Sequence, residues 1–219
     1  MNNIICIAGP TASGKTALAV ELAKELNGEV ISCDSMQVYR RMDIGTAKPS
    51  IDEMQGIVHH MINVADPEED FSVSRYCEMA TPILDDIIAR GKTAIIAGGT
   101  GLYMDSLIRG NDFAPYPATG ARQRLEAQAD EMGMEFMLAR LSTIDPDSAA
   151  RLHLADRKRI IRALEVFEET GETITAHNKR TQAIPPRYSP LWLGLDYEPR
   201  QALYDRIDRR VSIMLEQGL

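Results

Sequence analysis

The stretch that decides the fold is Ile4-Ile5-Cys6-Ile7-Ala8-Gly9-Pro10-Thr11-Ala12-Ser13-Gly14-Lys15-Thr16, an apolar run followed by a glycine-framed loop. Its spacing fits G-x-x-x-x-G-K-[ST], and the residues after it are amphipathic. This order predicts a strand, a phosphate-binding loop and a helix. The alternative is a glycine-rich turn with a solvated lysine, which the apolar run before the loop and the helical pattern after it disfavour.

The loop has the chemistry to bind a diphosphate or a nucleotide. Its predicted binding residues are Gly9, Pro10, Thr11, Ala12, Ser13, Gly14, Lys15 and Thr16. Glycines let several backbone N–H groups converge on one phosphate, and the following helix adds the positive end of its dipole. Lys15 would contact the outer phosphate, and the Thr16 hydroxyl would hold a Mg²⁺ ion shared with the phosphates. We therefore expect a phosphorylated ligand and Mg²⁺ as cofactor.

The composition restricts the class of protein. The net charge of −8 argues against a protein that simply coats nucleic acid. Cys6, Cys33 and Cys77 are odd in number and lie in apolar or helical sequence, which indicates buried thiols rather than a disulfide or zinc framework. The first apolar run is too short to span a bilayer, and no leader peptide is recognisable. We expect a cytoplasmic, monomeric enzyme without a membrane anchor.

Strand and helix patterns alternate in the first half of the chain. The predicted elements are strands at 4–8, 29–32 and 93–97, and helices that end at Leu26 or span 72–90 and 102–108. Pro82 should kink or split the second helix. The alternation predicts an α/β fold with a P-loop NTPase-like parallel sheet and a ligand at the carboxyl ends of the strands. Asp34, directly after the second strand, should therefore face the same edge as Lys15.

The pattern changes after Arg109. Residues 113–117 form a proline-punctuated linker, and the segments at 121–132, 135–144 and 157–170 are helical. A strand pattern returns only at 191–196, before a helix at 199–217. We therefore predict a helical insertion domain at 111–190, carried by an α/β core made of 1–110 and 191–219.

Six motifs in order resemble the tRNA dimethylallyltransferase (tRNA isopentenyltransferase) family. They are GPTASGKT at 9–16, DSMQVYR at 34–40, DIGTAKP at 43–49, His59-His60, GGTGLYM at 98–104 and DRKRIIRALEVFE at 156–168. Together they extend over most of the chain. Composition and periodicity alone would have indicated only a P-loop enzyme.

The resemblance implies transfer of a dimethylallyl group from dimethylallyl diphosphate to the exocyclic N6 amine of the adenosine 3′ of a tRNA anticodon. It implies that Asp34 is the general base and that Thr100 orients the reacting groups. From the residues alone, Asp34 could instead cap its own turn or bind Mg²⁺ through water, and Thr100 could be a helix N-cap. The tasks of Lys15, Thr16 and Mg²⁺ would be to neutralise the departing diphosphate.

The resemblance also implies a set of residues that bind the tRNA anticodon stem-loop. They are Asp34, Ser35, Met36, Gln37, Thr100, Arg122, Lys158, Arg159, Ile160, Ile161 and Arg162. The basic cluster on the helix at 157–170 could equally be a solvated face paired with its own glutamates. The target base must leave its stack to reach the active site, so a flipped nucleotide is expected.

By the same resemblance, Arg210 matches the arginine that holds the diphosphate, although any one arginine of the last helix could be a solvated surface residue. Family members continue beyond the position of Leu219 with further helices. The resemblance therefore implies a chain that lacks the C-terminal part, keeps diphosphate binding and loses much of its tRNA affinity and turnover.

Two other functions are compatible with the P-loop. One is a small-molecule kinase that uses ATP, with the arginines of 157–162 in a lid. The run Ile95-Ile96-Ala97-Gly98-Gly99 argues against it, because such kinases usually end this strand with an acidic metal ligand. The other is an RNA-binding module without catalysis. The fold alone does not distinguish these functions.

Overall fold

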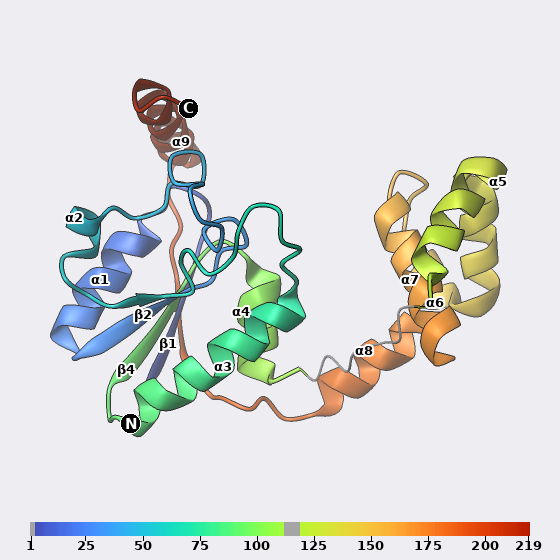
Figure 1. Cartoon of the computed structure of the whole chain (residues 1–219), viewed down its shortest axis with the longest axis horizontal. Helices are drawn as coiled ribbons and strands as arrows, with labels where there is room; N and C mark the ends of the chain where they lie inside the picture. The colour runs from blue at the N-terminus through green and yellow to red at the C-terminus, as the bar shows by residue number, and fades with distance from the viewer. Residues whose placement is uncertain (1–2, 112–118) are drawn as a thin grey trace. The chain divides into compact units, whose positions relative to one another are not determined.

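The structure, a computed structural model, describes residues 3–111 and 119–219, and the predicted linker at 113–117 lies outside the described residues. The chain divides into a core unit, residues 1–111 and 186–219, and a helical unit, residues 112–185 (Figure 1). The predicted boundary at 190 differs from the observed one by a few residues. The reason is that the N–H groups of Arg187 and Tyr188 bond to the carbonyls of Arg109 and Ile108 in the core.

The core unit is built on one five-stranded parallel sheet of order β3-β2-β4-β1-β5. The strands are β1 (Ile4–Ala8), β2 (Gly28–Ser32), β3 (His59–His60), β4 (Thr93–Ala97) and β5 (Leu191–Gly194). Strands β1, β2 and β4 are buried and rich in β-branched residues, as expected for a parallel sheet covered on both faces. The predicted α/β class is confirmed. The chain order does not reveal that β4 separates β1 from β2.

Helices cover both faces of the sheet (Figure 1). On one face, α1 (Lys15–Glu25) packs Ala19 and Ala23 against Ile5, Val30 and Ile95 of the strands. On the other face lie α3 (Val73–Ala89) and α4 (Gly101–Arg109), joined by the stacked rings of Tyr76 and Tyr103. Burial of these apolar surfaces is the main force that holds the three layers together.

One sequence expectation about the helices is wrong, and one short helix was missed. Helix α3 runs unbroken through Pro82, which lies exposed, so the carbonyl of Glu78 that loses its usual N–H partner can bind water there. The short α2 (Ile51–Met54) was not predicted, although Ser50 and Glu53 form a capping box at its start. The last helix, α9 (Arg200–Glu216), lies within its predicted range.

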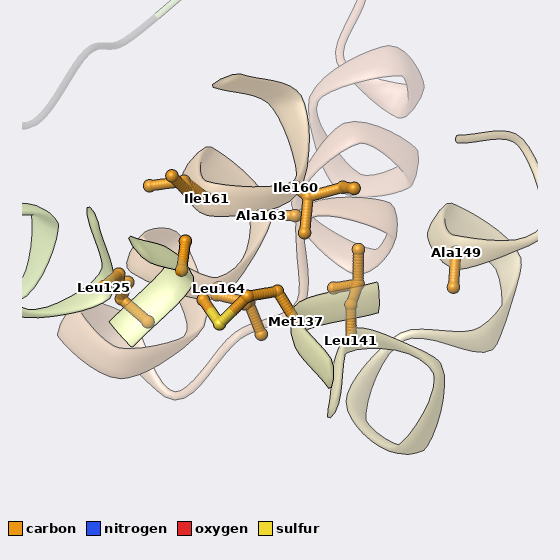
Figure 2. Packing of buried hydrophobic residues seen from close by; sticks show 9 residues of the cluster. Leu125, Met137, Leu141, Ala149, Ile160, Ile161, Ala163 and Leu164 are labelled. Atoms are coloured by element: carbon orange, nitrogen blue, oxygen red, sulfur yellow. The ribbon is translucent and has the colours of Figure 1, made fainter. Parts of the chain in front are cut away.

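The helical unit has a small core of its own. Its helices are α5 (Ala121–Ile144), α6 (Pro146–Ala149), α7 (Arg157–Thr170) and α8 (Ile174–Ala183). Non-helical angles at Gly133 divide α5 near the break predicted from sequence. Figure 2 shows Met137 and Leu141 of α5 lying against Ile160 and Leu164 of α7, all four fully buried. No helix in the described part of the chain is long and apolar enough to cross a membrane.

A buried carboxylate of β2 joins β3, the end of α3 and the segment before β4, away from the ligand edge. Glu29 of β2 is 4% exposed and accepts hydrogen bonds from Arg90 (2.5 Å), Lys92 (2.7 Å) and the ring of His60 (2.8 Å). The Arg90 contact above all, with those of Lys92 and His60, holds the pKa of Glu29 far below its ordinary value, although burial opposes this shift. A depressed carboxylate pKa stabilises the folded state at neutral pH.

We expect Glu29→Gln to lower the free energy of unfolding by about 2 kcal/mol at neutral pH, because three cationic or polar donors lose a charged acceptor. This stabilisation is complete above the ordinary pKa of 4.5 and is lost as the pH falls toward the lower folded-state pKa, so the two proteins should converge in acid. Denaturant titrations between neutral and acidic pH measure the difference. Glu25→Gln, at an exposed position on α1, is the control and should leave stability unchanged.

Candidate functional site

The candidate site lies where three strands end side by side. Since β4 pairs with both β1 and β2, the loops that follow these strands meet at one edge of the sheet. The loop after β1 is the phosphate loop, Cys33 and Asp34 follow β2, and Gly98 to Thr100 follow β4. The sequence predicted this edge for Asp34 and Lys15, and the strand order adds Thr100 between them.

The phosphate loop ends in an open helix N-terminus. Gly14 has φ 92°, a left-handed conformation that other residues adopt only with strain, and no side chain caps the first N–H groups of α1. Lys15 Nζ donates to the loop carbonyls of Gly9 (2.9 Å) and Pro10 (2.7 Å). Thr16 is exposed at the first turn of the helix. Uncapped N–H groups, a dipole and a lysine together form an anion-binding site.

Helix α9 contributes two arginines to this loop. Arg206 Nε donates to the carbonyl of Ala12 (2.8 Å) and its guanidinium lies 5.0 Å from the ring centroid of Tyr197. Arg210 carries a buried Nε without a hydrogen-bond partner in the described chain. Such an unpaired donor is costly unless an anion binds it. The expected role of Arg210 beside the diphosphate stays a prediction, which the binding experiment below tests.

Charges in the site act on one another. Burial, followed by the repulsion of Arg210, lowers the pKa of Lys15, while the attraction of Asp34 opposes this. Two cations are thus brought together with one carboxylate nearby. The described residues contain no group of three or more His, Cys, Asp or Glu side chains that could hold a metal ion by themselves. A bound anion fits this arrangement best, since its oxygen atoms could themselves serve as ligands of a metal ion.

Asp34 is held by one carboxylate oxygen and leaves the other available. Its Oδ1 accepts hydrogen bonds from the backbone N–H groups of Met36 (2.9 Å) and Gln37 (3.3 Å). Its Oδ2 accepts none from the described residues and faces the turn at Gly99, where an added Cβ would lie 3.6 Å away. The side chain therefore caps its own turn, as one alternative held, and still presents a fixed basic oxygen.

Thr100 joins the loops after β2 and β4. It is the N-cap residue of α4 by position, but its hydroxyl makes no capping bond. Instead Oγ1 accepts from the Ser35 N–H (2.9 Å) and donates to the Ser35 hydroxyl (3.2 Å). The loops approach so closely that a Cβ on Gly98 would lie 2.0 Å from the carbonyl oxygen of Cys33. Only glycine fits there, and the contact fixes Thr100 next to Asp34.

The remaining predicted residues of this edge have different surroundings. Met36 is 45% exposed and free to contact a ligand. The Gln37 side chain instead accepts from the Ser32 hydroxyl (3.0 Å) and donates to the carbonyl of Ala47 (3.2 Å), so it supports the loop that carries Asp34.

Burial raises the pKa of the Cys6 thiol to about 12, which leaves this free cysteine unreactive.

The predicted basic residues of the helical unit come together. Arg122, Lys158, Arg159 and Arg162 line one pocket. Ile160 and Ile161 are 0% and 2% exposed and belong to the hydrophobic core. Their side chains therefore cannot make the expected contact with RNA, because they lie on the inward face of α7.

Sequence reasoning missed α8 and with it two residues of this pocket, Ile174 and Asn178. The available signal was Thr173, whose hydroxyl accepts from the N–H of Ala176 as an N-cap. The sequence also assigned no role to Tyr197, whose hydroxyl donates to the carbonyl of Ser13 in the phosphate loop (3.5 Å).

We expect Arg210→Gln to weaken the binding of inorganic diphosphate by roughly ten- to a hundredfold, the size of a lost charge-assisted hydrogen bond. Calorimetry on the purified chain measures it. Arg209→Gln, the neighbouring exposed arginine, is the control and should bind diphosphate as the unchanged chain does. Equal weakening in both variants would show that only general charge matters.

Comparisons with known proteins identify the family of the chain. The family model described as IPP transferase matches residues 37–219. The tRNA dimethylallyltransferases of Acetivibrio thermocellus and Bacillus cytotoxicus are each 47% identical, over 100% and 99% of this chain and 70% and 68% of their own lengths. Two solved structures were matched over 100% of this chain. A eukaryotic dimethylallyltransferase acting on tRNA has TM-score 0.84, 33% identity and 54% of its chain covered. The full-length tRNA isopentenylpyrophosphate transferase of Bacillus halodurans has TM-score 0.64, 42% identity and 67% covered. The chain belongs to the IPP transferase family.

Proposed function

We propose that this chain is a tRNA dimethylallyltransferase: it transfers a dimethylallyl group from dimethylallyl diphosphate to the N6 amine of the adenosine 3′ of the anticodon, releasing diphosphate. The observation that carries the proposal is the unpaired Oδ2 of Asp34, held in place beside an open, cationic phosphate loop. The 47% sequence identity to two tRNA dimethylallyltransferases, which extends over 99–100% of this chain, supports it.

The donor end of the reaction is served by charges that are already in place. Cleavage of the bond between the allylic carbon and the diphosphate oxygen leaves positive charge on carbon and negative charge on the leaving group. The N–H groups of α1, Lys15 and Arg210 would take up that negative charge. Because these donors are fixed before the reaction, little reorganisation is needed as the bond breaks.

The acceptor end needs a base. The adenine N6 amine attacks the allylic carbon, the new N–C bond forms, and one proton must leave the nitrogen. Asp34 Oδ2 is the acceptor for this proton, since Oδ1 is occupied by backbone donors. The bonds of Thr100 to Ser35 hold the two loops together, and Thr100 would orient the amine or the transferred group.

Magnesium fits the residues present. The Thr16 hydroxyl is exposed at the helix N-terminus, makes no hydrogen bond within the described residues, and is the hard oxygen donor that Mg²⁺ prefers. We propose that Thr16 holds Mg²⁺ together with the phosphate oxygens of the donor. When bound, the ion would add positive charge beside the diphosphate.

Binding of the tRNA stem-loop would fall partly to the helical unit. Lys158 and Arg159 are exposed on α7, and Lys158 has no ion-pair partner among the described residues. Such side chains position RNA through its phosphates. The sequence Ala97-Gly98-Gly99 at the end of β4, which has no acidic residue, continues to argue against an ATP-dependent kinase.

Asp34→Asn should lower the rate of prenyl transfer by roughly a hundred- to ten-thousandfold, because the amide cannot accept the proton. Binding of dimethylallyl diphosphate should change less than about twofold, since Oδ1 still caps the turn. Single-turnover assays with an anticodon stem-loop measure the rate, and calorimetry measures donor binding with Mg²⁺.

Asp70→Asn, at an exposed loop position, is the control and should transfer at the unchanged rate. Full activity of Asp34→Asn would exclude Asp34 as the base. Tighter binding of ATP than of dimethylallyl diphosphate, with phosphate transfer to a small molecule, would favour the kinase instead.

A further inference from the structure

The helical unit contains a pocket of about 480 Å³, a size typical of a site for a small molecule or one residue of a polymer. All of its lining residues lie in this unit and none belongs to the site around Asp34. Five of them are cationic, Arg122, Arg151, Lys158, Arg159 and Arg162, and no carboxylate lines the pocket. In a chain of net charge −8, this concentration of positive charge indicates an anionic ligand.

Three of these cations keep accessible positive charge. Lys158 has no ion-pair partner in the described chain, and Arg122 and Arg159 pair with exposed or half-buried acids at 3.3 and 3.2 Å. Arg162 is different, because it pairs at 2.9 Å with the buried Glu165, so the rim rests on the other cations. Helices α5 and α7 also begin without a side-chain cap, so their first N–H groups add to the positive potential at this end of the unit. Phosphate is the anion best suited to such a rim.

A phosphate alone does not explain the rest of the pocket. Leu152, Ala163 and Ile174 provide apolar surface, and Ala163 is continuous with the core shown in Figure 2. Asn178 adds an amide that can both donate and accept hydrogen bonds. An apolar surface, guanidinium planes and one amide form the environment that an unstacked nucleobase requires.

We propose that this pocket binds one extruded nucleotide of the tRNA anticodon loop, separate from the acceptor adenosine. Its phosphates lie on the cationic rim, its base lies against Ile174 and Leu152, and Asn178 bonds to the base edge. The inference rests on the proposed function, because it takes the RNA from there. It adds Leu152, Ile174 and Asn178 as residues that select the loop rather than merely attract its backbone.

The test uses labelled anticodon stem-loops in which each loop nucleotide in turn lacks its base, with binding to the whole chain followed by fluorescence anisotropy. Among the loop positions other than the acceptor adenosine, loss of the base at one position should weaken binding by roughly tenfold, as expected for a lost stacked base. Asn178→Trp, which fills the pocket from an exposed position, should weaken binding of the intact loop by the same factor. It should not weaken further the loop that is abasic at that position, because both changes remove one interaction.

Ala176→Trp, exposed on the same helix outside the pocket lining, is the matched control and should bind every loop as the unchanged chain does. Additive effects of Asn178→Trp and all abasic positions, or no effect of any abasic position on the unchanged chain, would overturn the inference. So would equal affinity for free adenosine monophosphate and for the stem-loop. Prenyl transfer is assayed in parallel to separate this inference from the proposed function. If the chain transfers the prenyl group but Asn178→Trp and the abasic positions act independently, the inference fails and the proposed function stands.

Discussion

The contact that the rest of the site depends on is the one between the turn after β4 and the end of β2. Gly98 passes so close to the Cys33 carbonyl that no side chain fits between them. This approach aligns Thr100 with Ser35 and leaves Asp34 facing the turn with a free oxygen. A larger residue at Gly98 would separate the two loops, and Thr100 would lose its hydrogen bonds to Ser35 beside Asp34.

The donor half of the site is a collection of positive charge assembled before any ligand arrives. Burying Lys15 and bringing it close to Arg210 both cost free energy, and burial, followed by the repulsion of Arg210, lowers the pKa of Lys15. Arg206 and Tyr197 support the loop from outside, because they donate hydrogen bonds to the carbonyls of Ala12 and Ser13. Fixed charge of this kind stabilises a departing anion more effectively than charge that must move into place.

The helical unit separates packing from recognition by helix face. On α7, Ile160 and Leu164 point into the core, whereas Lys158 and Arg159 face water at the pocket. A stretch that the sequence groups as one basic motif therefore has two functions. Although the net charge of the chain is −8, five of its 24 Lys and Arg residues line one pocket, so the local charge there is positive.

The sequence by itself determined the parallel α/β class, the phosphate loop and the separate helical unit, because glycine spacing, strand composition and helix caps are local properties. The resemblance of the sequence to a known family also indicated Asp34, Thr100 and Arg210. The tertiary structure decided what depends on distant segments: the position of β4 between β1 and β2, the free Oδ2 of Asp34, the burial of Ile160, and the pocket completed by Asn178. These features follow from which surfaces pack together, and packing is not encoded in the spacing of any one motif.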